Sequence, residues 1–147
     1  MLTGPIGSPT SANNARSVYA TDLDGDGDAD VLSASDIDDK IAWYENLTVN
    51  QSGPSNPGSF GAQQVITTSA DRARSVYATD LDGDGDADVL SASNWDDKIA
   101  WYENLTVNLN GPASPGSFGP QQVITTSALY PWSCLLYTSP SPRARGC

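Results

Sequence analysis

The chain has 147 residues and a mass of 15.4 kDa, and its 7 Lys and Arg against 18 Asp and Glu give a formal net charge of −11. This length suits one ordinary domain, and the strong negative charge argues against binding to nucleic-acid phosphates. The sequence has no apolar run near the ~20 residues of a membrane helix and no signal peptide at its start, so we expect no membrane span.

The sequence repeats itself with a period of 58 residues, since the segment that begins at Ala15 recurs at Ala73. Residues 11–70 align with residues 69–128 without insertion, and nine of these sixty positions differ. A recent duplication explains copies this similar, and an artefact of sequence assembly is the alternative. A repeat architecture therefore has to be considered before any other fold.

The repeat also predicts how the chain is divided. We expect an end of a preceding repeat at 1–12, two repeats at 13–70 and 71–128, and a non-native tail at 129–147. Within that tail, CLLYTSPSPRA (Cys134–Ala144) resembles the translation of a sequencing adapter. Both cysteines, Cys134 and Cys147, lie in the tail, so disulfides are not expected to stabilise the repeats.

Each copy contains four strand-like runs separated by turn signals. The runs contain Val, Ile, Thr, Tyr or Trp, which suit a pleated and packed surface, and no window keeps helical spacing. In the first copy the predicted strands are Arg16–Leu23, Asp28–Ser35, Lys40–Leu47 and Gln63–Ser69. The stretch Gln51–Ala62 is rich in Pro, Gly and Ser and is predicted to be a loop.

Adjacent apolar residues within the strands indicate that both faces of each sheet are covered. Val31 and Leu32 are neighbours, as are Trp43 and Tyr44, and stacked copies of one sheet would cover both faces. The sequence therefore predicts an all-β fold of two four-stranded antiparallel blades of a β-propeller. Because a closed propeller uses about 4–8 blades, we expect the chain to be a fragment of a larger propeller.

Five aspartates fall within nine residues, DLDGDGDAD, at 22–30 and again at 80–88. Carboxylates this close repel one another unless they are protonated, solvated or bridged by a cation. The spacing matches positions 1, 3, 5, 7 and 9 of a calcium loop, with glycine at position 6 and a backbone carbonyl at position 7. The predicted calcium ligands are Asp22, Asp24, Asp26, Asp28 through its carbonyl, Asp30, Asp80, Asp82, Asp84, Asp86 through its carbonyl, and Asp88.

These loops differ from the helix–loop–helix calcium motif. The Glu that this motif has at position 12 is replaced by Ser33 or Ser91, and the flanking segments are predicted strands. We therefore expect two calcium sites of weak affinity, with dissociation constants on the order of 10⁻⁴ M or looser. The alternative is a solvated acidic turn that binds nothing.

The segments ATDLDGDGDADVLSAS, DDKIAWYEN and SFGAQQVITT resemble the FG-GAP/VCBS repeat, the calcium-binding blade of integrin-α-like propellers. The resemblance covers Ala12–Ala128. It implies a propeller of about seven blades on a secreted or cell-surface protein, with calcium held by the ten aspartates named above. Only two blades are present, which leaves closure of the ring open.

An apolar residue stands at the tip of the second predicted turn of each copy, Ile37 in one and Trp95 in the other. Both are candidate ligand contacts, because an exposed ring at a loop tip can anchor a partner. Folding back onto the neighbouring blade is the alternative. The Trp-Tyr pairs at 43–44 and 101–102 are expected to pack in the core.

Two further pairs of repeated residues follow the third predicted strand. Asn46 and Asn104 each begin an N-glycosylation sequon, and turn chemistry at the strand end is the alternative. Glu45 and Glu103 are the only glutamates. Because both copies carry one, we expect a structural role rather than the paired-carboxylate chemistry of glycoside hydrolysis.

The leading hypothesis is a non-catalytic, calcium-binding interaction module of an extracellular protein, used for adhesion or for binding a protein or another ligand. The sequence contains no His, and without a credible Cys it offers no nucleophile–base pair. The alternative is the carbohydrate-binding propeller portion of a polysaccharide-degrading enzyme, for which an exposed Trp95 would be the discriminating feature. A third hypothesis is that two blades alone are not a functional unit.

Overall fold

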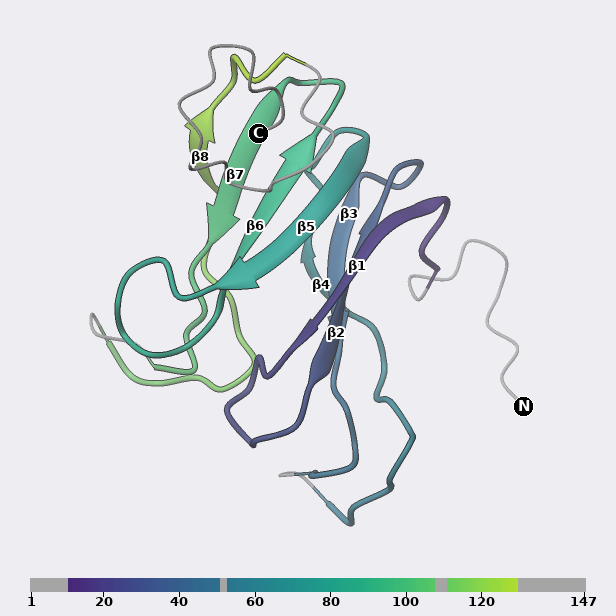
Figure 1. Ribbon diagram of the computed structural model, residues 1–147, viewed down its shortest axis with the longest axis vertical. Coiled ribbons are helices and arrows are strands. Elements are labelled where there is room, and N and C mark those ends of the chain that lie inside the picture. The colour runs from purple at the N-terminus through teal and green to yellow at the C-terminus, as the bar shows by residue number, and fades with distance from the viewer. Residues whose placement is uncertain (1–10, 51–52, 108–110, 130–147) are drawn as a thin grey trace, which may run out of the picture.

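The computed structural model describes residues 11–50, 53–107 and 111–129, and these residues form two four-stranded antiparallel sheets, one for each repeat (Figure 1). The strands of the first sheet are β1 (Ala15–Thr21), β2 (Asp30–Ser35), β3 (Lys40–Tyr44) and β4 (Gln64–Thr67). Those of the second are β5 (Ala73–Thr79), β6 (Asp88–Ser93), β7 (Lys98–Tyr102) and β8 (Gln122–Thr125). Strands adjacent in sequence pair with one another, so each sheet is a simple meander.

The prediction of an all-β fold with four strands in each copy is confirmed within the described ranges, which contain no helix. It follows that no helix able to cross a membrane is found in this part of the chain. The predicted adapter-like tail lies outside the described residues.

All four strands of the first sheet are shorter than predicted, and local contacts explain this for β2 and β3. Asp28 remains in the acidic loop, where its backbone N–H donates to Asp26 Oδ1 at 3.1 Å, so β2 begins two residues later than expected. The third strand does not continue to Leu47, because Glu45 leaves the ladder and its carbonyl accepts a hydrogen bond from the Gly61 N–H at 2.8 Å. Both deviations arise where the chain turns toward the acidic loop.

The two sheets share one apolar core, in which β5 packs against β1 and β2. Val76 on β5 is only 4% exposed, whereas its equivalent Val18 on β1 is 68% exposed. The ring of Trp43 is buried and contacts Phe118 of the second repeat edge to face, with the ring centroids 6.4 Å apart. Of the two Trp-Tyr pairs predicted to pack in the core, Trp43 and Tyr102 are buried, whereas Tyr44 and Trp101 are only partly buried. The second repeat thus supplies cover for the first sheet.

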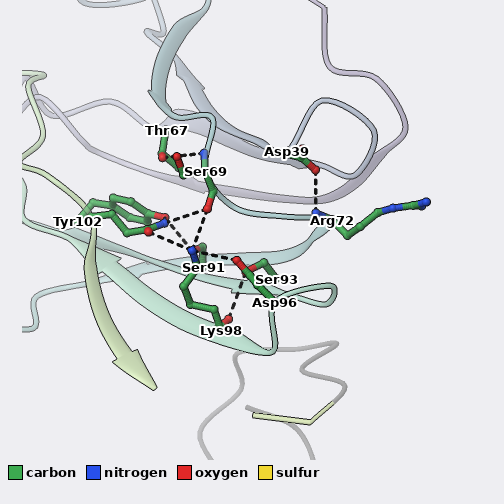
Figure 2. Close-up of polar contacts among 10 residues, drawn as sticks. Asp39, Thr67, Ser69, Arg72, Ser91, Ser93, Asp96, Lys98 and Tyr102 are labelled. Carbon is green, nitrogen blue, oxygen red and sulfur yellow. Dashed lines mark hydrogen bonds and ion pairs between the residues drawn. The ribbon is translucent and has the colours of Figure 1, made fainter. Parts of the chain in front are cut away.

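A polar network joins the second sheet to the end of the first repeat (Figure 2). Lys98 Nζ donates to the carbonyl oxygen of Ser69 at 3.0 Å and pairs with Asp96 at 2.9 Å. It also donates to Gln121, whose amide nitrogen in turn donates to the hydroxyl of Tyr102 at 2.8 Å. The segment between β4 and β5 is thereby fixed to the sheet that follows it.

Candidate metal centre

Each acidic loop connects the first and second strands of its sheet and is closed by its own first aspartate. Asp22 accepts hydrogen bonds from the backbone N–H groups of Gly25 at 2.8 Å and Gly27 at 2.9 Å. Gly27 has φ of 98°, a conformation that glycine adopts without steric cost. The sharp turn predicted at position 6 of the loop is therefore present.

The last aspartate of the first loop fastens it to the neighbouring strands. Asp30 is fully buried, and its two carboxylate oxygens accept from the N–H groups of Leu23 and Asn46, each at 2.8 Å. Asp88 makes the same pair of contacts in the second repeat, with Leu81 and Asn104. These hydrogen bonds position the carboxylates within the loop, since a charged acceptor makes stronger bonds than a neutral one.

The structure brings the predicted carboxylates together into two adjoining groups in each repeat, with the ligand atoms of a group within 4.8 Å of one another. The groups of the first repeat are Asp22, Asp24 and Asp30, and Asp24, Asp26 and Glu45. Those of the second repeat are Asp80, Asp82 and Asp88, and Asp82, Asp84 and Glu103. Such clusters of hard oxygen atoms are what calcium prefers as ligands.

Glu45 and Glu103 are additions that the loop spacing did not predict. Each follows the third strand of its sheet by one residue. In an antiparallel meander the end of the third strand and the loop between the first and second strands lie at the same end of the sheet. Strand order, rather than the spacing within the loop, is the signal that could have found these glutamates.

The carboxylate of Asp28 contacts the protein, rather than pointing freely into solvent. Its Oδ2 atom accepts from the N–H of Val49 at 2.7 Å, and Asp86 makes the equivalent contact with Val107. The predicted ligand roles of the Asp28 and Asp86 backbone carbonyls remain predictions. Both side chains instead tie the acidic loop to the segment that follows the third strand.

Four carboxylate oxygens in these loops are buried and lack a hydrogen-bond partner. They are Asp26 Oδ2, Asp28 Oδ1, Asp84 Oδ2 and Asp86 Oδ1. Burying a charged oxygen without a partner is unfavourable, and buried polar atoms are normally paired. The same atoms are unpaired in both repeats, so the donor set fits a cation that would compensate their charge.

The electrostatics of the loops also favour a bound cation. Burial, together with the carboxylates of Asp30 and Asp26, raises the pKa of Asp24 to about 7. Burial likewise raises the pKa of Asp86 to about 7 in the second repeat. The pKa of Glu45 is raised by burial and by Asp26 and Asp28. The folded loops therefore hold negative charge that is unfavourable without a compensating proton or cation.

These raised pKa values predict that, when calcium is absent, the folded protein is more stable at acidic pH than at pH 8. The folded pKa values of Asp24 and Asp86, about 7, lie above the ordinary value of 3.8, so the folded state binds protons more tightly than the unfolded state. We expect the free energy of unfolding in EDTA to rise as the pH falls from 8 toward 4. Urea unfolding at each pH measures it.

Calcium should reverse that trend, because calcium and protons compete for the same carboxylates. The stabilisation that calcium provides is expected to be largest at pH 8 and to shrink as the pH approaches 4. If stability in EDTA instead fell steadily from pH 8 to pH 4, the loop carboxylates would not be electrostatically strained in the folded protein.

Asn104 connects the two acidic loops. Its side chain is fully buried, and its amide nitrogen donates to the carbonyl oxygens of Leu23 and Ala87, both at 2.8 Å. Asn46, its equivalent in the first repeat, donates to Ala29 within its own repeat. The amide of Asn104 is therefore used inside the protein, and this favours the structural alternative over a glycosylated sequon.

The first acidic loop is more buried than the second, because the second repeat packs over it. Leu23 is 1% exposed, whereas its equivalent Leu81 is 40% exposed. Thr106 adds a hydrogen bond from its hydroxyl to the carbonyl of Leu23 at 3.1 Å. The two candidate sites thus have the same sequence and different surroundings.

Ile37 and Trp95, the two predicted ligand contacts, are exposed at 65% and 70%. They lie in the turns between the second and third strands, at the end of the sheets opposite the acidic loops. Both side chains are exposed, and their role as ligand contacts stays a prediction. Neither residue takes part in the metal centre.

Comparison with known proteins gives one match. Residues 22–91 match the family model described as an FG-GAP-like repeat, and this range contains both acidic loops. No curated protein and no solved structure matches the chain. The FG-GAP-like match over residues 22–91, together with the two four-stranded sheets, points to a β-propeller-type interaction module.

Proposed function

We propose that this chain is a non-catalytic, calcium-stabilised repeat module of a secreted or cell-surface protein, used for adhesion or for binding a protein or another ligand. The observation that carries the proposal is the set of buried, unpartnered carboxylate oxygens at equivalent positions of the two acidic loops. Their recurrence in a second loop with different surroundings supports a common binding role.

Calcium fits this donor set better than magnesium does. Calcium accepts 6–8 oxygen ligands in flexible geometry, whereas magnesium demands near-ideal octahedral geometry and usually keeps several waters. Asp24 belongs to both carboxylate groups of the first loop, and Glu45 adds an oxygen donor from beyond β3. A bound cation would supply the positive charge that these residues lack. The side chains would then hold the β1–β2 loop against the end of β3.

The hydrogen bonds of the loops favour a structural role over catalysis. Asp22 and Asp30 each use both of their carboxylate oxygens to accept backbone N–H groups. These contacts fix both side chains within the loop, beside the other carboxylate of their group. We therefore assign the loops to stability and to the positioning of neighbouring segments.

The packing of the two repeats supports assembly into a β-propeller. Val76 on β5 is buried where the second sheet packs against the first. Its equivalent on β1, Val18, is exposed. In a propeller each blade packs its face against the next one. Val18 thus marks the face on which a further repeat would pack by the contact already seen between β1 and β5.

Calcium titration by isothermal calorimetry of the full chain tests the proposal. We expect two calcium ions to bind per chain, with dissociation constants on the order of 10⁻⁴ M, and magnesium to bind more weakly. An absence of binding heat in millimolar calcium, for a chain shown by circular dichroism to be β-rich, would contradict it. So would equal affinity for the two metals.

A further inference from the structure

An open pocket lies between the two repeats, at the end of the sheets away from the acidic loops. It has a volume of about 390 Å³ and is lined by Ile37, Asp39, Asp71, Arg72 and Trp95. Ile37 and Asp39 come from the β2–β3 turn. Asp71 and Arg72 come from the segment between β4 and β5, and Trp95 comes from the β6–β7 turn. Pockets that hold small ligands have volumes of about 300–1,000 Å³ and combine an apolar surface with a few polar groups.

The ring of Trp95 is held in place without being covered. Its side chain is 70% exposed, and the guanidinium carbon of Arg72 lies 4.9 Å from the ring centroid. Arg72 Nη1 is in turn 3.3 Å from Asp36 Oδ1, and Asp36 is fully buried. The cation–π contact thus fixes the ring through a buried carboxylate, while most of the side chain remains open to a ligand.

The backbone at Arg72 is unusual for its residue type. Arg72 has φ of 58°, in the left-handed region, where the first repeat has Asn14 with φ of 59°. Asparagine adopts this conformation more readily than arginine. The Arg72 N–H donates to Asp39 Oδ1 at 2.9 Å, and Figure 2 shows the side chain extending away from this contact. Backbone strain of this kind gathers at functional sites.

Some of the differences between the two repeats fall around this pocket. Of the nine differing positions, four fall here: Asn13/Asp71, Asn14/Arg72, Asp36/Asn94 and Ile37/Trp95. Asp71, Arg72, Ile37 and Trp95 line the pocket, and Asp36 pairs with Arg72. The other five positions lie in the Pro- and Gly-rich loops at 51–62 and 109–120. The copies have therefore diverged at the pocket and in these loops, whereas the strands that build the sheets have not changed.

The charges around the pocket balance. Asp36 is within ion-pair distance of three guanidinium groups, those of Arg16, Arg72 and Arg74, at 3.2, 3.3 and 3.7 Å. Asp39 and Asp71 add two carboxylates at the pocket wall, so three positive charges meet three negative ones. A balanced site favours a neutral ligand over a polyanion or a basic peptide, because neither sign of charge is in excess.

We propose that this pocket binds a neutral saccharide. The apolar face of a sugar ring stacks on Trp95, its hydroxyl groups donate to the carboxylates of Asp39 and Asp71, and Arg72 donates to a ring or hydroxyl oxygen. Large planar side chains combined with a few donors and acceptors give such a pocket both its affinity and its orientation. The inference deepens the proposed interaction function by naming a ligand class, and it rests on that function.

The test is an NMR titration of the full chain in calcium with cellotetraose, xylotetraose, mannotetraose and galactotetraose. The indole N–H resonance of Trp95 is assigned by its loss in Trp95→Ile. We expect at least one of the four to shift this resonance in a saturable way. Trp95→Ile and Arg72→Asn install the residues that the first repeat carries at these positions, and each should weaken binding by about tenfold or more.

Phe60→Ile is the matched control, because Phe60 is an exposed aromatic residue outside the pocket. It should leave saccharide binding unchanged. The proposal is overturned if none of the four oligosaccharides shifts the Trp95 resonance, or if binding survives Trp95→Ile. It is also overturned if tetragalacturonate or a lysine-rich peptide binds this pocket instead. Calcium titration of the same sample reports on the metal sites at the opposite end, so failure of one proposal is distinguishable from failure of the other.

Discussion

Replacing Asp26 and Asp84 together with asparagine will abolish most of the calcium-dependent stabilisation and will stabilise the calcium-free protein. Each residue carries a buried, unpartnered carboxylate oxygen in its loop. A ligand that binds only the folded state at about 100 times its dissociation constant adds ~2.7 kcal/mol per site, so the double variant should lose about 5 kcal/mol of calcium-dependent stabilisation. In EDTA the loss of like-charge repulsion should add about 1 kcal/mol.

Urea unfolding in calcium and in EDTA measures both effects. Asp97→Asn is the isosteric control, since Asp97 lies in the turn at the opposite end of the second sheet. It removes one negative charge outside the acidic loops and should leave the difference between calcium and EDTA unchanged. A double variant that keeps the full calcium increment would show that Asp26 and Asp84 do not belong to a metal site.

Asn104→Ala is expected to destabilise the protein by about 3 kcal/mol, because it removes a buried donor from two backbone carbonyls. The affected carbonyls belong to Leu23 in the first acidic loop and Ala87 in the second. Loss of this link should also weaken calcium binding at the first loop. Urea unfolding in EDTA isolates the structural part, and calcium calorimetry measures the effect on affinity.

Asn46→Ala is the matched comparison, because Asn46 is only partly buried and its amide donates within its own repeat. It should cost about 1 kcal/mol. Equal destabilisation by the two variants would show that the contact of Asn104 with the first repeat contributes nothing. A larger effect of Asn104→Ala would place the cross-repeat hydrogen bonds among the interactions that hold the sheets together.

Much of this architecture could be predicted from the sequence because it depends on local patterns. The 58-residue period, the four strand-like runs and the spacing of Asp and Gly in each loop are all short-range features. Loop closure by Asp22 onto Gly25 and Gly27 follows from the same spacing. Predictions of this kind fail mainly at strand ends, as at Asp28 and Leu47, where contacts with other segments decide where the ladder stops.

Features that depend on contacts between distant segments could not be predicted in the same way. Glu45 joins the first metal cluster because β3 ends beside the β1–β2 loop. Asn104 reaches a carbonyl 81 residues earlier in the chain, and no local pattern encodes that contact. The pocket is a similar case, because the sequence left open whether Trp95 is exposed or folds back onto the neighbouring blade. Its proximity to Ile37 depends on how the two sheets pack.

The most direct test of a calcium-stabilised repeat is a thermal unfolding experiment on the full chain, followed by circular dichroism. It compares about 10 mM calcium, which is about 100 times the expected dissociation constant, with the same concentration of magnesium and with EDTA. Two sites that together add about 5 kcal/mol should raise the midpoint by about 15 °C in calcium. Magnesium should raise it much less. A β-rich protein that melts at the same temperature in calcium and in EDTA would contradict the account and leave the two acidic loops as solvated turns.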